Sequence, residues 1–163
     1  MAIRKAVIED LPKLVEIYNQ AVLTKRCTAD METFEVEEKV NWFNSHMDEA
    51  YPLYVYEEND NVIGYVHLSG YRPGRRAMKH IAEVSYYIHD NHHRKGIGSQ
   101  MMTFIINEAK SLGYRDLLAI LLSWNIGSIK LLEKFGFEEW GNLPDIADFD
   151  GDVCSHLYYG LKL

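Results

Sequence analysis

Cysteine is scarce in this sequence: of 163 residues only two are cysteines, Cys27 and Cys154, and they lie far apart in the chain. A disulfide framework requires more cysteines and a zinc site requires clustered ligands, so neither is expected. The chain starts without the apolar run of a secretion signal, and it has no apolar stretch long enough to span a bilayer. These absences predict a cytoplasmic protein that does not bind membranes.

Basic residues are outnumbered as well, because 17 Lys and Arg stand against 24 Asp and Glu, for a formal net charge of -7. Nucleic-acid binding requires a basic face, so no nucleic acid is expected as a partner, although a local basic pocket for a small anion remains compatible. Apolar residues make up 47% of the chain and aromatic residues 12%, which excludes a disordered chain. No repeat or linker divides the sequence, so we expect a single domain over residues 1–163.

Hydrophobic periodicity predicts a mixed succession of strands and helices. Strands are expected over residues 2–7, 53–57, 62–69, 82–89, 117–122, 137–140 and 153–163. Helices are expected from residue 9 to residue 22, through Val36, Val40, Phe43 and Met47, and over residues 99–112 and 126–135. Two segments have the order strand, helix, strand, which favours parallel pairing with right-handed crossovers. The expected fold class is α/β, with a mixed central β-sheet flanked by helices.

The most informative segment is residues 86–100, where a strand runs into a basic turn with two glycines and then into a helix. Gly96 and Gly98 allow a ligand to approach the backbone, and the first N–H groups of a helix bind phosphate. Arg94 and Lys95 add full charges. The segment lacks the third glycine of a dinucleotide fingerprint and the Gly-Lys-Ser/Thr of a nucleotide-binding loop. Taken alone, a tight turn with solvated charges explains it equally well.

Three histidines, His89, His92 and His93, cluster in the same turn. Adjacent histidines in a turn rarely converge on one ion, and no cysteine or glutamate has a suitable spacing to complete a site. We therefore expect no metal.

Two segments together resemble the GCN5-related N-acetyltransferase (GNAT) superfamily. Residues 93–98, His-Arg-Lys-Gly-Ile-Gly, resemble its motif A, Gln/Arg-x-x-Gly-x-Gly/Ala, with His93 departing from the first position. Residues 124–137 resemble its motif B, Asn-x-x-Ser/Ala-Ile-x-Leu-Tyr-Glu-Lys-Leu-Gly-Phe. Within the superfamily, residues 17–22, 41–43, 51–53 and 62–65 are similar to phosphinothricin and methionine sulfoximine or sulfone acetyltransferases.

The resemblance implies the GNAT fold, with splayed strands at the acetyl-CoA site, and transfer of an acetyl group from acetyl-CoA to an amine. It implies that the pantetheine arm pairs with the backbone of the strand that holds Tyr86, Tyr87 and Ile88, and that the pyrophosphate lies on the backbone N–H groups of residues 94–99. The cofactor-binding positions it implies are Tyr86, Tyr87, Ile88, His93, Arg94, Lys95, Gly96, Ile97, Gly98, Ser99 and Asn125.

Acetyl transfer to an amine needs positioning, a base and an oxyanion donor, but no covalent intermediate. Glu83 is the expected base, directly or through a water, since strand alternation points it to the same face as Ser85 and Tyr87. A solvated or ion-paired strand carboxylate is the alternative interpretation of Glu83. The backbone N–H of Ile88 is the expected oxyanion donor. Many relatives have a Tyr in motif B that protonates the thiolate, and the residue there is Leu132.

The acceptor site matches the relatives less well, because Met78 and Ile81 stand where they have Tyr and Thr. Phe34, Arg72, Arg75 and Glu83 are the expected substrate-binding residues, the arginines through a substrate carboxylate. Solvated loop charges are the alternative for the arginines, and a core role is the alternative for Phe34.

The predicted function is transfer of acetyl from acetyl-CoA to the amine of a small amino acid-like substrate of the phosphinothricin or methionine sulfone and sulfoximine type. One alternative is an enzyme that acts on a polyamine or a protein N-terminus. Another is an acyl-CoA-binding sensor without catalysis. Relatives often dimerise, so a homodimer is among the expected assemblies.

Overall fold

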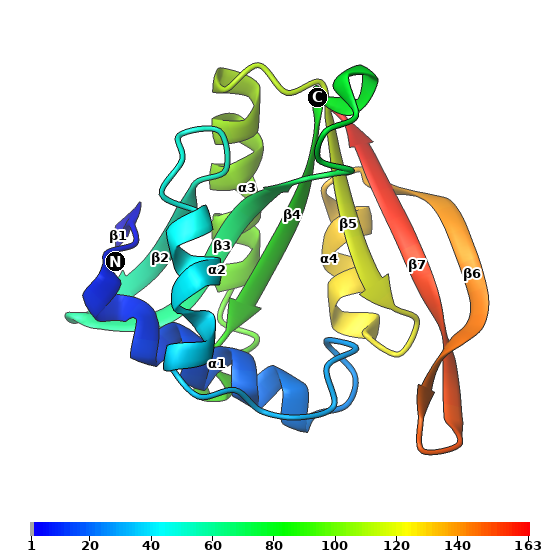
Figure 1. The fold of residues 1–163 in the computed structure, drawn as a ribbon, viewed down its shortest axis with the longest axis horizontal. Coiled ribbons are helices and arrows are strands. Elements are labelled where there is room, and N and C mark those ends of the chain that lie inside the picture. Colours follow the sequence, from blue (N-terminus) through cyan, green and yellow to red (C-terminus); the bar gives the residue numbers. More distant parts are fainter. Residues whose placement is uncertain (1) are drawn as a thin grey trace.

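Seven strands form one mixed sheet in a computed structural model that describes residues 2–163 (Figure 1). Their order across the sheet is β1-β2-β3-β4-β5-β7-β6, and every neighbouring pair is antiparallel except β4 with β5. The strands are β1 (Ala2–Lys5), β2 (Leu53–Glu58), β3 (Asn61–Gly70), β4 (Ile81–Ile88), β5 (Asp116–Leu122), β6 (Glu138–Phe149) and β7 (Asp152–Lys162).

Helices cover both faces of this sheet. The α-helices are α1 (Leu11–Leu23), α2 (Val40–Ser45), α3 (Ile97–Ser111) and α4 (Ile126–Lys134), and the short 3₁₀ turns are η1 (Ile8–Asp10), η2 (Glu37–Lys39), η3 (Arg76–Met78) and η4 (Asp90–His92). None of the helices within residues 2–163 has the length and apolar character that a bilayer crossing requires.

Alternation along the strands creates two cores, one on each face. On β2, Leu53 and Val55 belong to the core under α1 and α2, whereas Tyr54 and Tyr56 belong to the core under α3 and α4. All four side chains are at most 7% exposed. Because both faces are covered, the first four residues of β2, Leu53 to Tyr56, are all apolar or aromatic rather than alternating with charged residues.

Parallel pairing was expected in both strand–helix–strand segments, and the structure confirms it in the first but not in the second. Strands β4 and β5 pair in parallel as predicted. Strands β5 and β6 are not neighbours, because β7 inserts between them, antiparallel to both. An interior strand must be buried on both faces, and β7 supplies buried Leu157 and Tyr159, whereas β6 is exposed along most of its length. The turn at Asp150 and Gly151, with φ of 58° and 103°, folds β7 back against β6.

Two boundaries also differ from the prediction. The predicted strand over residues 137–140 extends to Phe149 as β6, because β7 supplies hydrogen-bond partners to a sequence with no hydrophobic alternation. Met47 was expected on the buried face of the second helix, but α2 ends at Ser45 and Met47 is 51% exposed. The chain leaves the helix there because His46 turns inward and packs against Trp42.

An ion-pair cluster fixes the start of α1 against the sheet edge. The Arg4 guanidinium on β1 donates to both carboxylate oxygens of Asp10, at 2.7 and 3.0 Å, and its Nε donates to Glu57 on β2 at 2.8 Å. Burial acts to raise the pKa of Asp10, but the Arg4 hydrogen bonds and the Val7 N–H hold it below its usual value. Since α1 forms one wall of the cavity described below, this cluster positions that wall.

The substitution Asp10→Asn should lower the free energy of unfolding at pH 7 by about 1–3 kcal/mol, because it removes the charged acceptor for Arg4. A lowered pKa stabilises the fold above the ordinary Asp value of about 3.9, and that contribution is lost as pH falls through the folded value. The gap between parent and variant, measured by urea unfolding, should therefore shrink at about pH 3. The exposed, unpaired Asp60 offers a control, and a loss of equal size in Asp60→Asn would contradict the assignment.

Candidate active site

A gap opens in the sheet between β4 and β5. The two strands pair over three positions, the last being Glu83 with Leu118, although β4 continues to Ile88 and β5 to Leu122. Figure 1 shows the two strands diverging toward the ends nearest α1 and α4. This is the splayed arrangement that the sequence led us to expect.

Backbone groups of β4 face this gap. The His89 N–H donates to the Ile63 carbonyl at 2.9 Å, and alternation along an antiparallel ladder then directs every second residue of β4 toward β3. The N–H and C=O groups of Tyr86 and the N–H of Ile88 consequently point away from β3 and into the gap. An extended amide-containing chain can pair with them as an added strand would.

The turn after β4 leads directly into α3. Gly96 is the N-cap of α3 and has a φ of 80°, a conformation that favours glycine. At Gly98 an added Cβ would lie 3.0 Å from the Leu131 side chain, so α3 packs closely on α4 there and a larger residue would displace that side chain. None of the N–H groups of residues 94–99 donates to an acceptor within residues 2–163. The turn therefore offers consecutive free donors and the positive end of a helix.

The side chains predicted to bind the cofactor divide into several roles. Arg94 and Lys95 are exposed beside the free N–H groups, whereas Ile97 is 4% exposed and contributes only its backbone. His93 donates from Nε2 to the Ile88 carbonyl at 2.8 Å and so fixes the turn. Asn125 accepts from the Ser128 N–H at 3.2 Å and caps α4.

One cation near the turn escaped the sequence analysis. Lys134, at the end of α4, donates to the Ser99 hydroxyl at 3.0 Å and so brings a positive charge to the first turn of α3. Motif B contains a lysine at this position, but only the packing of α4 on α3 shows that it lies beside motif A.

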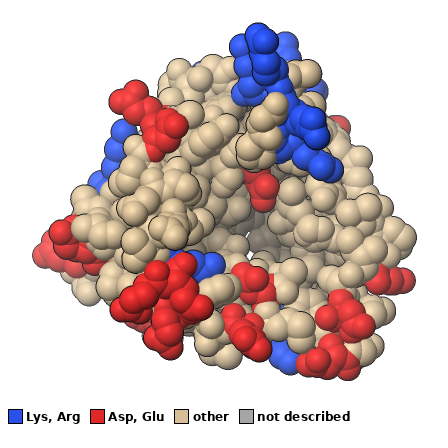
Figure 2. Space-filling view, in the orientation of Figure 1, with Lys and Arg blue, Asp and Glu red and all other residues tan. Residues whose placement is uncertain are grey.

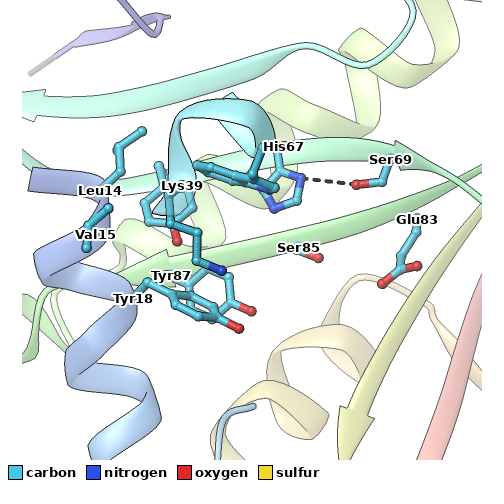
Figure 3. Close-up of a pocket in the computed structure, with 11 residues that line it drawn as sticks. Leu14, Val15, Tyr18, Lys39, His67, Ser69, Glu83, Ser85 and Tyr87 are labelled. Atoms are coloured by element: carbon cyan, nitrogen blue, oxygen red, sulfur yellow. Dashed lines mark hydrogen bonds between the residues drawn. The ribbon is translucent and has the colours of Figure 1, made fainter. Parts of the chain in front are cut away.

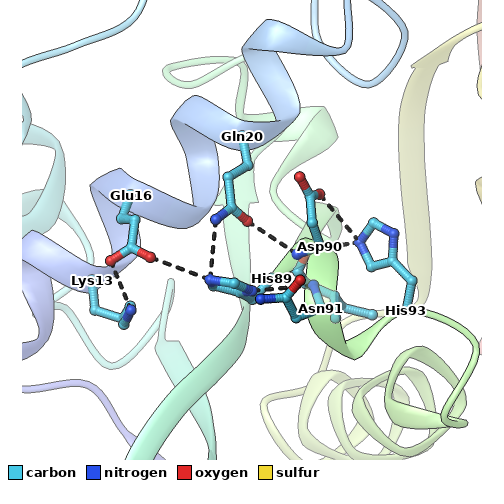
Figure 4. A network of polar contacts seen from close by, with 8 residues as sticks. Lys13, Glu16, Gln20, His89, Asp90, Asn91 and His93 are labelled. Carbon is cyan, nitrogen blue, oxygen red and sulfur yellow. Dashed lines mark hydrogen bonds and ion pairs between the residues drawn. The ribbon is translucent and has the colours of Figure 1, made fainter.

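A polar network ties this turn to α1 (Figure 4). His89 Nε2 lies 3.2 Å from a Glu16 carboxylate oxygen and 3.1 Å from the Gln20 amide nitrogen. Gln20 in turn accepts from the Asp90 N–H at 3.0 Å. His89 of the histidine cluster thus links the turn to α1. No group of three or more His, Cys, Asp or Glu side chains within residues 2–163 is arranged to hold a metal ion.

A cavity of about 240 Å³ lies on the α1 and α2 side of the sheet, next to the gap (Figure 3). Alternate residues of β4 form its floor, namely Glu83, Ser85 and Tyr87, as the strand period predicted. Drug-sized ligands occupy pockets of roughly 300–1,000 Å³. The cavity therefore suits a molecule the size of one amino acid.

Glu83 is the carboxylate of this cavity. It makes no hydrogen bond or ion pair with residues 2–163, and burial raises its pKa above the usual value for glutamate. The ion-paired alternative has no partner among residues 2–163. A half-buried carboxylate with free lone pairs and a raised pKa has the properties of a general base.

An aromatic cluster from β3 and α2 lies beside β4 in the cavity. The ring of His67 lies 5.5 Å from Trp42 and 4.5 Å from His46, measured between centroids. Burial and the neighbouring His46 lower the pKa of His67 to about 3, so this imidazole is neutral at physiological pH. Its weak basicity leaves Glu83 as the stronger base in the cavity.

The other predicted acceptor residues lie outside the cavity lining. Arg72 and Arg75 are exposed in the loop between β3 and β4, where Figure 2 shows basic side chains above a hollow in the molecular surface. Phe34 lies behind the lining, with its ring 6.0 Å from that of Tyr18. Leu132, at the motif B position where relatives have Tyr, is 1% exposed in the core and offers no proton donor.

Comparison with known proteins identifies the family. A model of the acetyltransferase (GNAT) domain matches residues 3–152. YwnH of Bacillus subtilis (strain 168), provisionally named a phosphinothricin acetyltransferase, is 41% identical over 152 residues, covering 93% of this chain and 92% of that protein. An L-methionine sulfoximine/L-methionine sulfone acetyltransferase of Salmonella typhimurium (strain LT2) is 31% identical over 147 residues, covering 90% of this chain and 85% of that protein.

A solved structure agrees with these relatives. The GNAT superfamily phosphinothricin acetyltransferase (Pat) from Sinorhizobium meliloti, in complex with acetyl-CoA, has a TM-score of 0.92 and 28% identity, covering 99% of this chain and 88% of that chain. The expected GNAT fold is thereby confirmed, and a protein of the same fold binds acetyl-CoA. This chain belongs to the GNAT family and is an acetyl-CoA-dependent N-acetyltransferase.

Proposed function

We propose that the protein acetylates the α-amine of a small amino acid or amino acid analogue of the phosphinothricin or methionine sulfone and sulfoximine type. The observation that carries this proposal is the unpartnered Glu83 carboxylate on the floor of an amino acid-sized cavity beside the β4–β5 gap. The acceptors of the similar enzymes named above support the substrate class.

The gap and the turn together would hold acetyl-CoA. The free N–H groups of residues 94–99 would hold the pyrophosphate, with Arg94, Lys95 and Lys134 supplying charge. The pantetheine amides would pair with the backbone of Tyr86. This path brings the thioester alongside the floor of the cavity, so that the acceptor reaches it from the α1 and α2 side.

The reaction follows from this placement. The amine nitrogen attacks the thioester carbonyl carbon, a C–N bond forms, and the C–S bond breaks with departure of the CoA thiolate. The proton lost by the amine passes to Glu83, directly or through a water, and the thiolate takes its proton from solvent since Leu132 cannot donate one. The Ile88 N–H, which faces the gap, would stabilise the oxyanion. Much of the acceleration comes from holding the amine in line with the carbonyl.

The size of the cavity argues against the protein N-terminus as acceptor. A peptide would need an open groove that continues beyond the first residue, whereas a cavity of about 240 Å³ holds one residue. A polyamine would be drawn to acidic walls, and Glu83 is the one acidic residue in this lining within the described chain.

An amine panel tests the proposal directly. With saturating acetyl-CoA, thiol release should be seen with phosphinothricin, methionine sulfone and methionine sulfoximine, and it should be much slower with spermidine and a short peptide. Faster turnover of the polyamine or the peptide, or tight acetyl-CoA binding with no turnover of any amine, would contradict the proposal.

The base assignment predicts that Glu83→Gln lowers kcat by about 10²–10⁴-fold and leaves the Kd for acetyl-CoA unchanged. Only ionised Glu83 accepts a proton, so the parent activity should fall as pH drops through its raised pKa. That acidic limb of the kcat/KM profile should disappear in the variant. Glu138→Gln, at an exposed position of β6, is the control. An acidic limb that persists in Glu83→Gln would assign the base elsewhere.

The turn predicts a loss of cofactor affinity in Gly96→Val, because a branched side chain cannot keep a φ of 80° and the free N–H groups would turn away. Gly113 is a matched control: it has a φ of 83°, equally open surroundings, and lies beyond the other end of α3. Gly113→Val should destabilise the fold similarly but leave the Kd for acetyl-CoA unchanged in titration calorimetry. Equal effects of the two variants on the Kd would indicate strain alone.

A further inference from the structure

The second charged residue of the cavity is Lys39, at the end of η2. It is the one Lys or Arg in this lining within the described chain. Its Nζ lies 3.5 Å from the ring centroid of Phe34 and 4.8 Å from that of Tyr18. It makes no hydrogen bond or ion pair with residues 2–163. The nearby carboxylate of Asp30 instead accepts a hydrogen bond from the Tyr18 hydroxyl at 2.5 Å.

Lys39 and Glu83 stand at opposite ends of the cavity. The ring of Tyr18, over which Lys39 lies, packs edge-on against Tyr87 at 4.9 Å. Tyr87 follows Glu83 by four residues, and four residues of strand span about 13 Å. Figure 3 shows the same order, with the Lys39 ammonium beside Tyr18 and Tyr87, Glu83 at the far end, and Ser85 between them.

The ammonium donors of Lys39 are available to a ligand, because no residue among 2–163 accepts from them. Two aromatic rings attract the ammonium through their faces but accept none of its N–H groups as a carbonyl or carboxylate would. Burial lowers the pKa of Lys39, opposed by the charges of Asp30 and Glu38. A ligand that brings an oxygen acceptor into this end of the cavity gains a hydrogen bond to a charged group, which an apolar side chain cannot make.

We propose that Lys39 binds an oxygen-bearing group at the side-chain end of the acceptor, such as a sulfone, sulfoximine or phosphinate oxygen, and so selects acceptors that carry one. The proposal rests on the function proposed above. With the amine near Glu83, the α-carboxylate is attached to the same carbon and stays at that end. The group that reaches Lys39 is therefore the far end of the side chain, with its methyl against the ring of Tyr18.

The pair methionine sulfone and methionine tests this directly, because the two acceptors share one skeleton and differ by two oxygens. In Lys39→Met, KM for the sulfone should rise about 10- to 100-fold, as expected for loss of a hydrogen bond to a charged group, with kcat within about threefold. KM for methionine should change by less than about threefold. The preference for the sulfone would thus disappear.

Three controls separate selectivity from structure. Lys39→Arg keeps the charge and should restore most of the preference, and Lys110→Met, at an exposed position of α3, should leave it intact. Thermal unfolding checks that each variant folds, and Lys39→Gln replaces Lys39→Met if the latter does not. If KM rises equally for both acceptors in a folded variant, Lys39 serves only to hold the rings of Phe34 and Tyr18 together. That result would overturn the proposal.

Failure of the proposed function gives a different result. If the parent enzyme acetylates neither acceptor, the proposed function is wrong. The role of Lys39 can then still be tested by measuring the binding of methionine sulfone to the CoA-loaded protein. Calorimetry should then show sulfone binding that weakens about 10-fold or more in Lys39→Met. Absence of sulfone binding to the parent, or equal binding to parent and variant, would overturn the role of Lys39.

Discussion

The early end of the pairing between β4 and β5 is the constraint on which the rest of the site depends. Three residue pairs hold the strands together, and beyond Glu83 each backbone is left with an unpaired edge in the middle of a sheet. Unpaired backbone groups in a protein interior are costly, so such an edge persists where a ligand satisfies it. The same divergence places three features together: the gap-facing amides of β4, the free N–H groups before α3, and the floor of the acceptor cavity.

The two charges of the cavity have opposite signs and cannot neutralise each other. Glu83 stands where the sheet opens, and Lys39 stands against the aromatic rings at the α1 end. A direct ion pair would have satisfied both groups and removed the basicity of Glu83. Keeping them at opposite ends leaves a base for the amine and a donor for a polar side chain. The neutral ring of His67 lines the wall without competing for either proton or anion.

Most of the fold was predictable, because strong periodicity and turn residues mark most of the elements. The hairpin of β2 and β3, the crossover through α3 and the buried β5 lie close to where the pattern placed them. The part of strand β6 beyond Trp140 was missed because it is exposed and lacks alternation, and its strand character comes from β7. The turn at Asp150 and Gly151 was the local signal that a hairpin follows. Lys39 was missed too. It lies three residues after Val36 and four residues before Phe43, a spacing that puts it beside the apolar face of the helix predicted through Val36, Val40, Phe43 and Met47.

The sequence by itself determined the glycines of the turn, the basic residues around them and the β4 face that carries Glu83, since these depend on neighbours in the chain and on the strand period. The motifs that relate the chain to its family are local for the same reason. Only the tertiary structure decided that Lys134 meets the start of α3, that Lys39 lines the cavity while Arg72 and Arg75 stay outside it, and that β7 separates β5 from β6. Those arrangements arise from packing between segments far apart in sequence, where burial and unpaired polar groups set the outcome and no local pattern records it.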